Sequence, residues 1–170
     1  GGGQCGLAIG ARLKRLGVPS VIVDKHPRAG DCWRNRYDAL HLHDPVFACH
    51  LPHVPLPDDF PLWMHKDQMA DFLEAYVKLL DLNLWTSSTC VSTTWDDGSK
   101  EWSVKVNRDG TEVQLRPKHL ILATGLYGGP WMPELEGREQ FQGEVFHSCE
   151  YKNGQKYAGK RTIVVGSNTS

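Results

Sequence analysis

Long apolar runs are absent from this 170-residue sequence, and none approaches the ~20 residues that a membrane-spanning helix needs. No basic stretch followed by an apolar core opens the chain, so we expect no signal peptide in it, although the sequence does not begin with Met. An excess of one charge is also lacking, because 19 basic and 20 acidic residues leave a formal net charge of −1. We therefore expect no nucleic-acid partner and no anionic membrane surface.

Paired cysteines are lacking as well. The five cysteines are an odd number, and no two of them have C-x-x-C spacing. This argues against a disulfide framework, a zinc site and a dithiol redox centre, and it favours reduced thiols in a cytoplasmic protein. Four histidines gather between residues 41 and 53, but the prolines among them and the lack of a helical i, i+4 pair favour a loop. We predict no metal site.

The composition is typical of a soluble globular protein, with 40% hydrophobic and 23% charged residues. The length suffices for one domain with a core or for pieces of two. Periodicity predicts a helix over residues 7–17, ended by Gly17, and then a short buried parallel strand over 20–25. Residues 26–62 have little periodicity but contain several aromatics, which indicates a long functional loop. Residues 65–82 predict an amphipathic helix.

The remaining predicted elements are strands. Short alternating runs over residues 82–117, separated by the turns DDGSK and RDG, predict a small antiparallel sheet. Residues 119–125 (HLILATG) and 161–170 (RTIVVGSNTS) each predict a buried strand that leads into a small-residue turn. Two glycine turns so far apart, one at residues 1–6 and one from residue 166, suggest two nucleotide-binding lobes, the second barely begun.

The opening GGGQCG fits the pattern G-x-G-x-x-G of a dinucleotide-binding turn. Its first glycine allows the tight turn, its second lets a pyrophosphate approach the backbone, and its third lets the helix pack closely. Asp24 ends the next strand 18 residues after Gly6, close to the ~20 expected of an acid that binds ribose hydroxyls. The alternative is an ordinary βαβ turn with a solvated aspartate. An acid here disfavours a 2′-phosphate, so the pattern suits FAD or NAD better than NADP.

A second candidate stretch is GDCW, within residues 29–45. Gly30 and Asp31 would let the chain pass close to a ligand, and Trp33 offers a flat apolar face. The alternative is a buried tryptophan that anchors a loop.

These stretches, in chain order, resemble flavin-dependent monooxygenases of the two-dinucleotide type. That family includes the flavin-containing monooxygenases, with the plant auxin-forming indole-pyruvate monooxygenases as close relatives. GGGQCG, GDCW, ATGLYGGP and FQGEVFHSCEYK carry the resemblance, which covers essentially the whole chain. The last is the most specific, since residues 141–152 fit F-x-G-x-x-x-H-x-x-x-(F/Y)-(K/R). Related Baeyer–Villiger enzymes end this motif with Trp followed by Pro or Asp, so Tyr151 and Lys152 indicate the flavin-containing branch.

The resemblance implies an α/β fold in two parts. Residues 1–128 would form a Rossmann-like FAD-binding lobe of the three-layer ββα type, with the antiparallel sheet as an insertion. Residues 129–170 would be a linker and the start of a second, NADPH-binding Rossmann lobe. The resemblance also implies a chain truncated at both ends, because the first strand and the C-terminal part of the FAD lobe have no counterpart in it.

The implied cofactors are FAD and NADPH, and the resemblance assigns residues to each. For FAD they are Gly1, Gly3, Gln4, Gly6, Asp24, Lys25, Gly30, Asp31, Trp33, His43, Val91, Ala123, Thr124 and Gly125. For NADPH they are His147, Tyr151, Lys152, Gly166, Ser167, Asn168, Thr169 and Ser170. Val91 would contact the adenine through its main chain. His43 and Asp44 stand where many relatives place an Asn near the flavin. Whether one of them replaces that amide or the alignment shifts stays open.

The implied reaction is oxygenation of a small amine, sulfide or keto acid by O₂ through a C4a-hydroperoxyflavin. Because the cofactor carries the chemistry, no triad or catalytic base is expected. The alternatives are an inactive nucleotide-binding fragment, a disulfide-reductase-like flavoprotein and a Baeyer–Villiger enzyme. The second needs a redox cysteine pair that the sequence lacks. We expect the 170-residue chain alone to bind FAD poorly and to be inactive, and a full-length parent to be the monooxygenase. The sequence indicates no oligomeric state.

Overall fold

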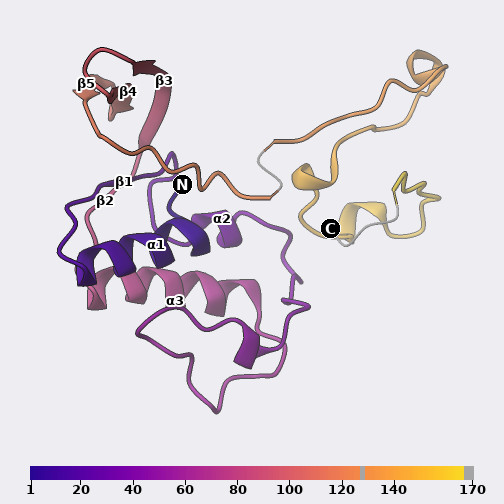
Figure 1. Ribbon diagram of the computed structural model, residues 1–170. Helices are drawn as coiled ribbons and strands as arrows, with labels where there is room; N and C mark the ends of the chain where they lie inside the picture. Colours follow the sequence, from indigo (N-terminus) through magenta and orange to yellow (C-terminus); the bar gives the residue numbers. More distant parts are fainter. Residues whose placement is uncertain (127–128, 167–170) are drawn as a thin grey trace.

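The computed structural model describes residues 1–126 and 129–166, and Figure 1 shows the order of their elements. The helices are α1 (Gln4–Arg15), α2 (Asp31–Arg34) and α3 (Lys66–Leu79), with short 3-10 helices η1 (Val46–Ala48), η2 (Arg138–Gln140), η3 (Ser148–Glu150) and η4 (Gln155–Tyr157). The strands are β1 (Ile22–Val23), β2 (Leu84–Trp85), β3 (Ser88–Asp96), β4 (Glu101–Arg108) and β5 (Thr111–Leu115). Over these residues, no helix combines the length and the apolar character that crossing a membrane requires.

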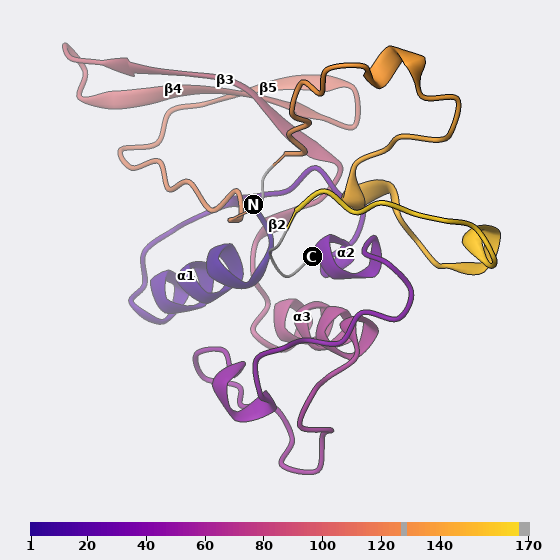
Figure 2. The same ribbon diagram turned by 90° about the vertical axis from the view of Figure 1, so that its right-hand side faces the viewer.

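The elements form a mixed α/β arrangement in layers. In Figures 1 and 2 the sheet β3–β4–β5 lies on one side of the parallel pair β1–β2, and helices α1 and α3 lie on the other side. Residues 129–166 run beside these layers and pass close to α2 (Figure 2). The layering agrees with the predicted α/β class.

Helix α1 packs on the parallel strands through small residues. Its buried positions Gly6, Leu7, Gly10 and Ala11 form one stripe at helical spacing. A Cβ on Gly10 would lie 2.5 Å from the Cδ1 atom of Ile22, so the helix approaches β1 closely. The helix starts at Gln4, three residues before the predicted start, because the glycine turn itself forms its first turn.

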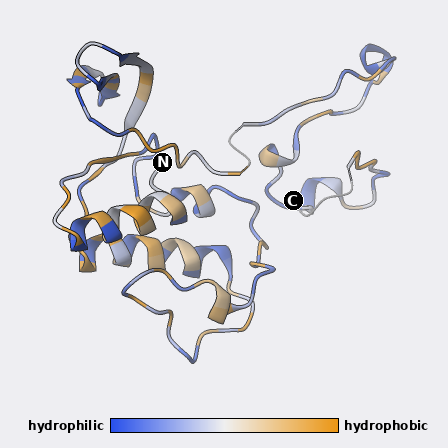
Figure 3. Cartoon of the chain, viewed as in Figure 1, coloured by the Kyte–Doolittle hydropathy of each residue, from blue (hydrophilic) through white to orange (hydrophobic). Residues whose placement is uncertain are grey.

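Helix α3 covers the loop that precedes it. Its N-cap His65 accepts a hydrogen bond from the Asp67 amide, and the Gln68 side chain accepts one from the His65 amide, which completes a capping box. The buried Tyr76 hydroxyl donates to the Pro52 carbonyl at 2.7 Å. Helices α1 and α3 both carry hydrophobic residues (Figure 3). The core includes Leu7, Ala11, Ile22, Leu40, Leu42, Leu56, Met64, Met69, Leu73, Tyr76 and Leu82.

The antiparallel sheet is confirmed over β3, β4 and β5. Asp109 and Gly110 both have positive φ, of 48° and 85°, as a two-residue hairpin between right-twisted strands requires. The prediction was wrong for residues 82–87, which were expected in this sheet. Within them β2 pairs parallel with β1, Ile22 facing Leu84 and Val23 facing Trp85. The reason is that α3 separates the two strands, and a helical crossover returns the chain parallel.

The two other predicted buried strands do not form in the described residues. Neither 119–126 nor 161–166 contains a residue in a strand. Leu122 is 78% exposed, and Ile163 and Val164 are 88% and 86% exposed. Their composition favours a buried strand, but a strand also needs a neighbour that takes its backbone hydrogen bonds. No described residue supplies that neighbour.

Candidate nucleotide-binding site

The N-terminus of α1 presents unused amide groups. Gly3 is the N-cap and, as a glycine, has no side chain to accept a hydrogen bond from the first amides of the helix. The first helical hydrogen bond runs from the Leu7 amide to the Gly3 carbonyl at 3.0 Å. The amides of Gln4, Cys5 and Gly6 are therefore free of helical partners, and no acidic residue lies in the first turn. Such an end attracts anions, because its amides and the helix dipole both favour negative charge.

Three backbone segments meet at this turn. A Cβ on Gly6 would lie 1.8 Å from the Gly1 carbonyl oxygen, and a Cβ on Gly1 would lie 2.1 Å from the Ala123 carbonyl oxygen. Only glycine fits at these two positions, as the fingerprint predicts. The ATG stretch, Ala123 to Gly125, is thereby placed against the first turn although more than 100 residues separate them in sequence. In Figure 1 this segment passes beside the N-terminus.

Asp24 lies at the end of β1 and faces the same turn. Its Oδ2 accepts a hydrogen bond from the Gly2 amide at 2.5 Å, and its Oδ1 accepts from the His26 amide at 2.8 Å and contacts the His26 ring Nδ1 at 2.8 Å. Burial raises the pKa of Asp24, but the hydrogen bonds from His26 and Gly2 outweigh it and hold the pKa below the ordinary value of 3.8. The carboxylate is therefore ionised, and as a carboxylate oxygen Oδ2 has the capacity to accept from a second donor such as a hydroxyl. The role of His26 was not predicted.

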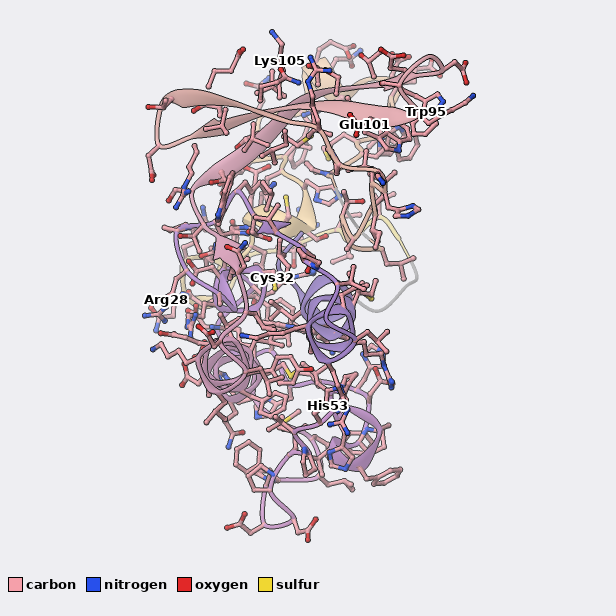
Figure 4. All side chains as sticks on the ribbon, turned by 60° about the vertical axis from the view of Figure 1, so that its left-hand side comes forward. Arg28, Cys32, His53, Trp95, Glu101 and Lys105 are labelled. Carbon is pink, nitrogen blue, oxygen red and sulfur yellow. The ribbon has the colours of Figure 1, made fainter. Side chains whose placement is uncertain are left out.

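The GDCW stretch lies beside the turn. The position of a Cβ on Gly3 would be 3.8 Å from the Cys32 sulfur. Burial raises the pKa of the Cys32 thiol, so this group is neutral and does not repel an anion. Gly30 has φ of 87°, and a Cβ there would lie 2.3 Å from the Ala70 carbonyl oxygen of α3. Cys32 lies between the sheet and the helices in Figure 4, whereas Arg28 points outward.

A network of charges holds this stretch on α3. Arg34 donates to Asp31 at 3.1 Å, to Asp71 at 2.7 Å, to Glu74 at 2.9 Å and to the Ala29 carbonyl at 2.6 Å. Burial lowers the pKa of Arg34, but the three carboxylates outweigh it and raise the pKa. The Asp31 carboxylate is paired with Arg34, and its place at the cofactor stays a prediction. The network joins residues 37 and 40 positions apart, so sequence spacing gave no signal for it.

Val91, Trp33 and Lys25, also predicted at FAD, lie in three different surroundings. Val91 lies in a β-bulge, because the register passes from the Cys90–Val106 pair to the next pair without giving Val91 a partner on β4. Its backbone is thus available for the predicted main-chain contact. Trp33 is half-buried and packs against the core, and Lys25 is exposed.

His43 and Asp44 lie at the surface. Their side chains are 75% and 68% exposed, and His43 Nε2 is 3.9 Å from Asp44 Oδ2. Among hydrogen bonds between described residues, none joins either side chain to the Gly1–Gly6 turn. The position of His43 and Asp44 near the flavin therefore stays a prediction. In the part of the chain that the structure describes, no group of three or more His, Cys, Asp or Glu could hold a metal ion.

The residues predicted at NADPH form a separate segment. His147 is the N-cap of η3, where its Nδ1 accepts from the Cys149 amide at 3.1 Å and Glu150 accepts from the His147 amide at 3.3 Å. Tyr151 and Lys152 contact the loop after α2. Gly166 is exposed, with φ of 141°. Ser167, Asn168, Thr169 and Ser170 lie outside the described residues.

Comparisons with known proteins agree with the flavoprotein resemblance. Residues 46–170 match the family described as flavin-binding monooxygenase-like. The whole chain is 39% identical to a probable indole-3-pyruvate monooxygenase, YUCCA9 of Arabidopsis thaliana, and spans 41% of that protein. A flavin monooxygenase from Stenotrophomonas maltophilia, a Q193R H194T mutant, superposes with a TM-score of 0.83 at 27% identity over 92% of this chain and 46% of its own. A bacillithiol disulfide reductase from Bacillus cereus shares the fold alone, with a TM-score of 0.72 at 18% identity over 81% of this chain and 42% of its own.

Proposed function

Because the chain belongs to the flavin-binding monooxygenase-like family, we propose that it is the N-terminal part of an enzyme that oxygenates a small molecule with FAD, NADPH and O₂. The family binds FAD and NADPH. The chain spans less than half the length of its curated relatives, so the activity is proposed for the complete protein.

The observation that carries the proposal is the meeting of Gly1, Gly6, Asp24 and Ala123 at one turn. The free amides of α1 fit a pyrophosphate, and the glycines leave the space that its close approach needs. The ionised Asp24 fits the ribose hydroxyls of an adenosine. A carboxylate at this place repels a 2′-phosphate, so this turn suits FAD and leaves NADPH to the second lobe.

The residues of this chain would bind and orient the cofactor. FAD, when bound, supplies the oxygen chemistry. The α1 amides would hold the pyrophosphate, Asp24 would fix the ribose, and the Arg34 network holds the GDCW stretch on α3. No side chain of the site is needed as a general base, which agrees with the lack of a triad in the sequence.

Two substrate classes differ in their support. The 39% identity to a probable indole-3-pyruvate monooxygenase over the whole chain favours a 2-keto acid. A soft nitrogen or sulfur nucleophile rests on the motif resemblance to flavin-containing monooxygenases alone, so the 2-keto acid has the stronger support.

The test is isotope incorporation by the complete protein. Purified with FAD, it is expected to oxidise NADPH, to consume O₂ and to place one ¹⁸O atom from ¹⁸O₂ in the product of a keto acid or sulfide. A disulfide-reductase-like enzyme would instead consume NADPH with a disulfide and take up no oxygen. NADPH oxidation without label in any product refutes the proposal. The 170-residue chain, titrated with FAD in parallel, is expected to bind weakly.

A further inference from the structure

Residues 129–166 are tied to the flavin lobe at a single place among the described residues. The Asp38 amide donates to the Lys152 carbonyl at 2.8 Å, and the Asn153 side chain donates to Asp38 Oδ2 at 2.9 Å. The Lys152 ammonium donates to the Asn35 carbonyl. These are the hydrogen bonds found between residues 129–166 and residues 1–126. The rings of Tyr37 and Tyr151 add an aromatic contact, with centroids 6.0 Å apart. We call residues 35–38 together with 151–153 the clasp.

Hydrogen bonds to α2 and α3 hold the flavin-lobe half of the clasp. Asn35 is the C-cap of α2, whose Arg34 is bound by carboxylates of α3. The buried Lys66 ammonium donates to the Arg34 carbonyl at 3.2 Å, a favourable place for a cation because carbonyls at a helix C-terminus carry negative charge. The Asp38 carbonyl accepts from His65 Nε2 at 2.8 Å. Since His65 is the N-cap of α3, the clasp rests on two helices.

The other half of the clasp has its own small structure. Tyr151 stacks on Tyr157 at 6.4 Å, and Tyr157 stacks on Phe146 at 5.7 Å. Lys156 pairs with Glu144 at 2.8 Å beside these rings. A contact made by Asp38 is therefore transmitted to the whole segment 144–157 rather than to one loose residue.

We infer that Asp38 is a positioning residue, which through Asn153 and Lys152 fixes segment 144–157 on the flavin lobe and so sets the place of the nicotinamide nucleotide. The inference rests on the proposed function, since that function assigns this segment to NADPH. Among the described hydrogen bonds the Asp38 side chain meets Asn153 and none joins Asp38 to the Gly1–Gly6 turn, so replacing it leaves the contacts of that turn in place. Neither Asp38 nor Asn153 is among the residues predicted to bind either cofactor.

The experiment compares Asp38→Ala, Asn153→Ala and their double variant in the complete flavoprotein. Each single variant is expected to raise the KM for NADPH and the Kd for NADP⁺ about threefold to tenfold, the worth of one exposed hydrogen bond to a carboxylate. The kcat and the Kd for FAD should stay unchanged. The double variant should be no worse than either single one, because both remove the same contact. Asp38→Asn keeps an acceptor oxygen for Asn153 and should restore the wild-type KM.

Asp97→Ala is the matched control, since this carboxylate is 88% exposed on the turn after β3 and belongs to the distant sheet. It should leave all constants unchanged. Amide exchange within segment 144–157 should accelerate in Asp38→Ala and not in Asp97→Ala, a readout that needs no activity. Unchanged NADP⁺ affinity or unchanged exchange in Asp38→Ala overturns the inference. A wild-type protein that does not bind NADP⁺ refutes the proposed function itself, and this is seen before any variant is compared.

Discussion

Replacing Gly6 by alanine tests the geometry of the proposed FAD turn. The new Cβ would lie 1.8 Å from the Gly1 carbonyl oxygen, and ordinary contacts begin at 3.4 Å, so the two backbones must separate by about 1.6 Å. Gly1 has little freedom to move, because its own Cα packs against the Ala123 carbonyl. The strain therefore acts on the turn that would hold the pyrophosphate.

A shift of this size exceeds what a hydrogen bond tolerates. Amide-to-oxygen bonds span about 2.7 to 3.2 Å, so a displacement near 1.6 Å breaks those made by the moved amides. Each bond to a charged acceptor is worth about 1.5 to 3 kcal/mol. Loss of two of them costs about 3 kcal/mol at the least, and FAD affinity should fall by about 100-fold or more.

The assay is a titration of the complete protein, freed of its cofactor, with FAD. Binding is measured by the quenching of flavin fluorescence. Gly10→Ala is the matched control, because it lies in the same helix but its Cβ would meet only the Cδ1 and Cγ1 atoms of Ile22, a side chain that can rotate. Its FAD affinity should stay within about threefold of wild type, since α1 gains helix propensity and the turn is untouched. If Gly6→Ala binds FAD as tightly as Gly10→Ala, the reasoning about the turn is refuted.

Three further changes probe what holds the site. Tyr76→Phe removes the buried hydrogen bond to the Pro52 carbonyl and should lower the free energy of unfolding by about 1 to 2 kcal/mol in urea titrations; an unchanged midpoint contradicts this. Arg34→Met leaves the buried Asp31 carboxylate with Arg28 as its weaker partner, so the free energy of unfolding should fall by about 2 kcal/mol in the same titrations. An unchanged free energy of unfolding would show that the Arg34 network does not stabilise the fold. For Asp24 the folded pKa is lowered, so its stabilisation is present above the ordinary value of 3.8 and is lost as pH falls through the lowered pKa. The stability advantage of wild type over Asp24→Asn should therefore shrink below about pH 5, and a constant difference from pH 7 to pH 3 would argue against it.

The elements that sequence predicted well are those whose signal is local. Helical periodicity gave α3 and most of α1, and Asp109 with Gly110 gave the hairpin turn. The start of α1 was missed because periodicity begins at Leu7, whereas the helix already includes Gly6 of the fingerprint. A glycine in the first helical turn weakens the apolar pattern while it permits the close packing that the site needs.

The contacts that sequence missed join residues far apart. Arg34 meets Asp71 and Glu74 across 37 and 40 positions, and Lys152 meets Asn35 across 117. Charged residues on a helix are usually a solvated face, so nothing in the spacing distinguishes Asp71 and Glu74 from other surface acids. Only the packing of α2 on α3 brings them together.

Residues 119–126 show how composition and pairing contribute separately to a strand. Their apolar residues predict burial, yet Ile121 is 50% and Leu122 is 78% exposed, and Figure 3 shows hydrophobic residues on this segment without a neighbouring strand. The backbone at Ala123 nevertheless contacts Gly1 as closely as glycine allows. Its place is thus set by the fit between small residues at the turn, and hydrogen bonding within a sheet is not required for that fit. Placement of the ATG segment against the first turn therefore does not depend on a strand at residues 119–126, since it rests on the backbone contact of Ala123 with Gly1.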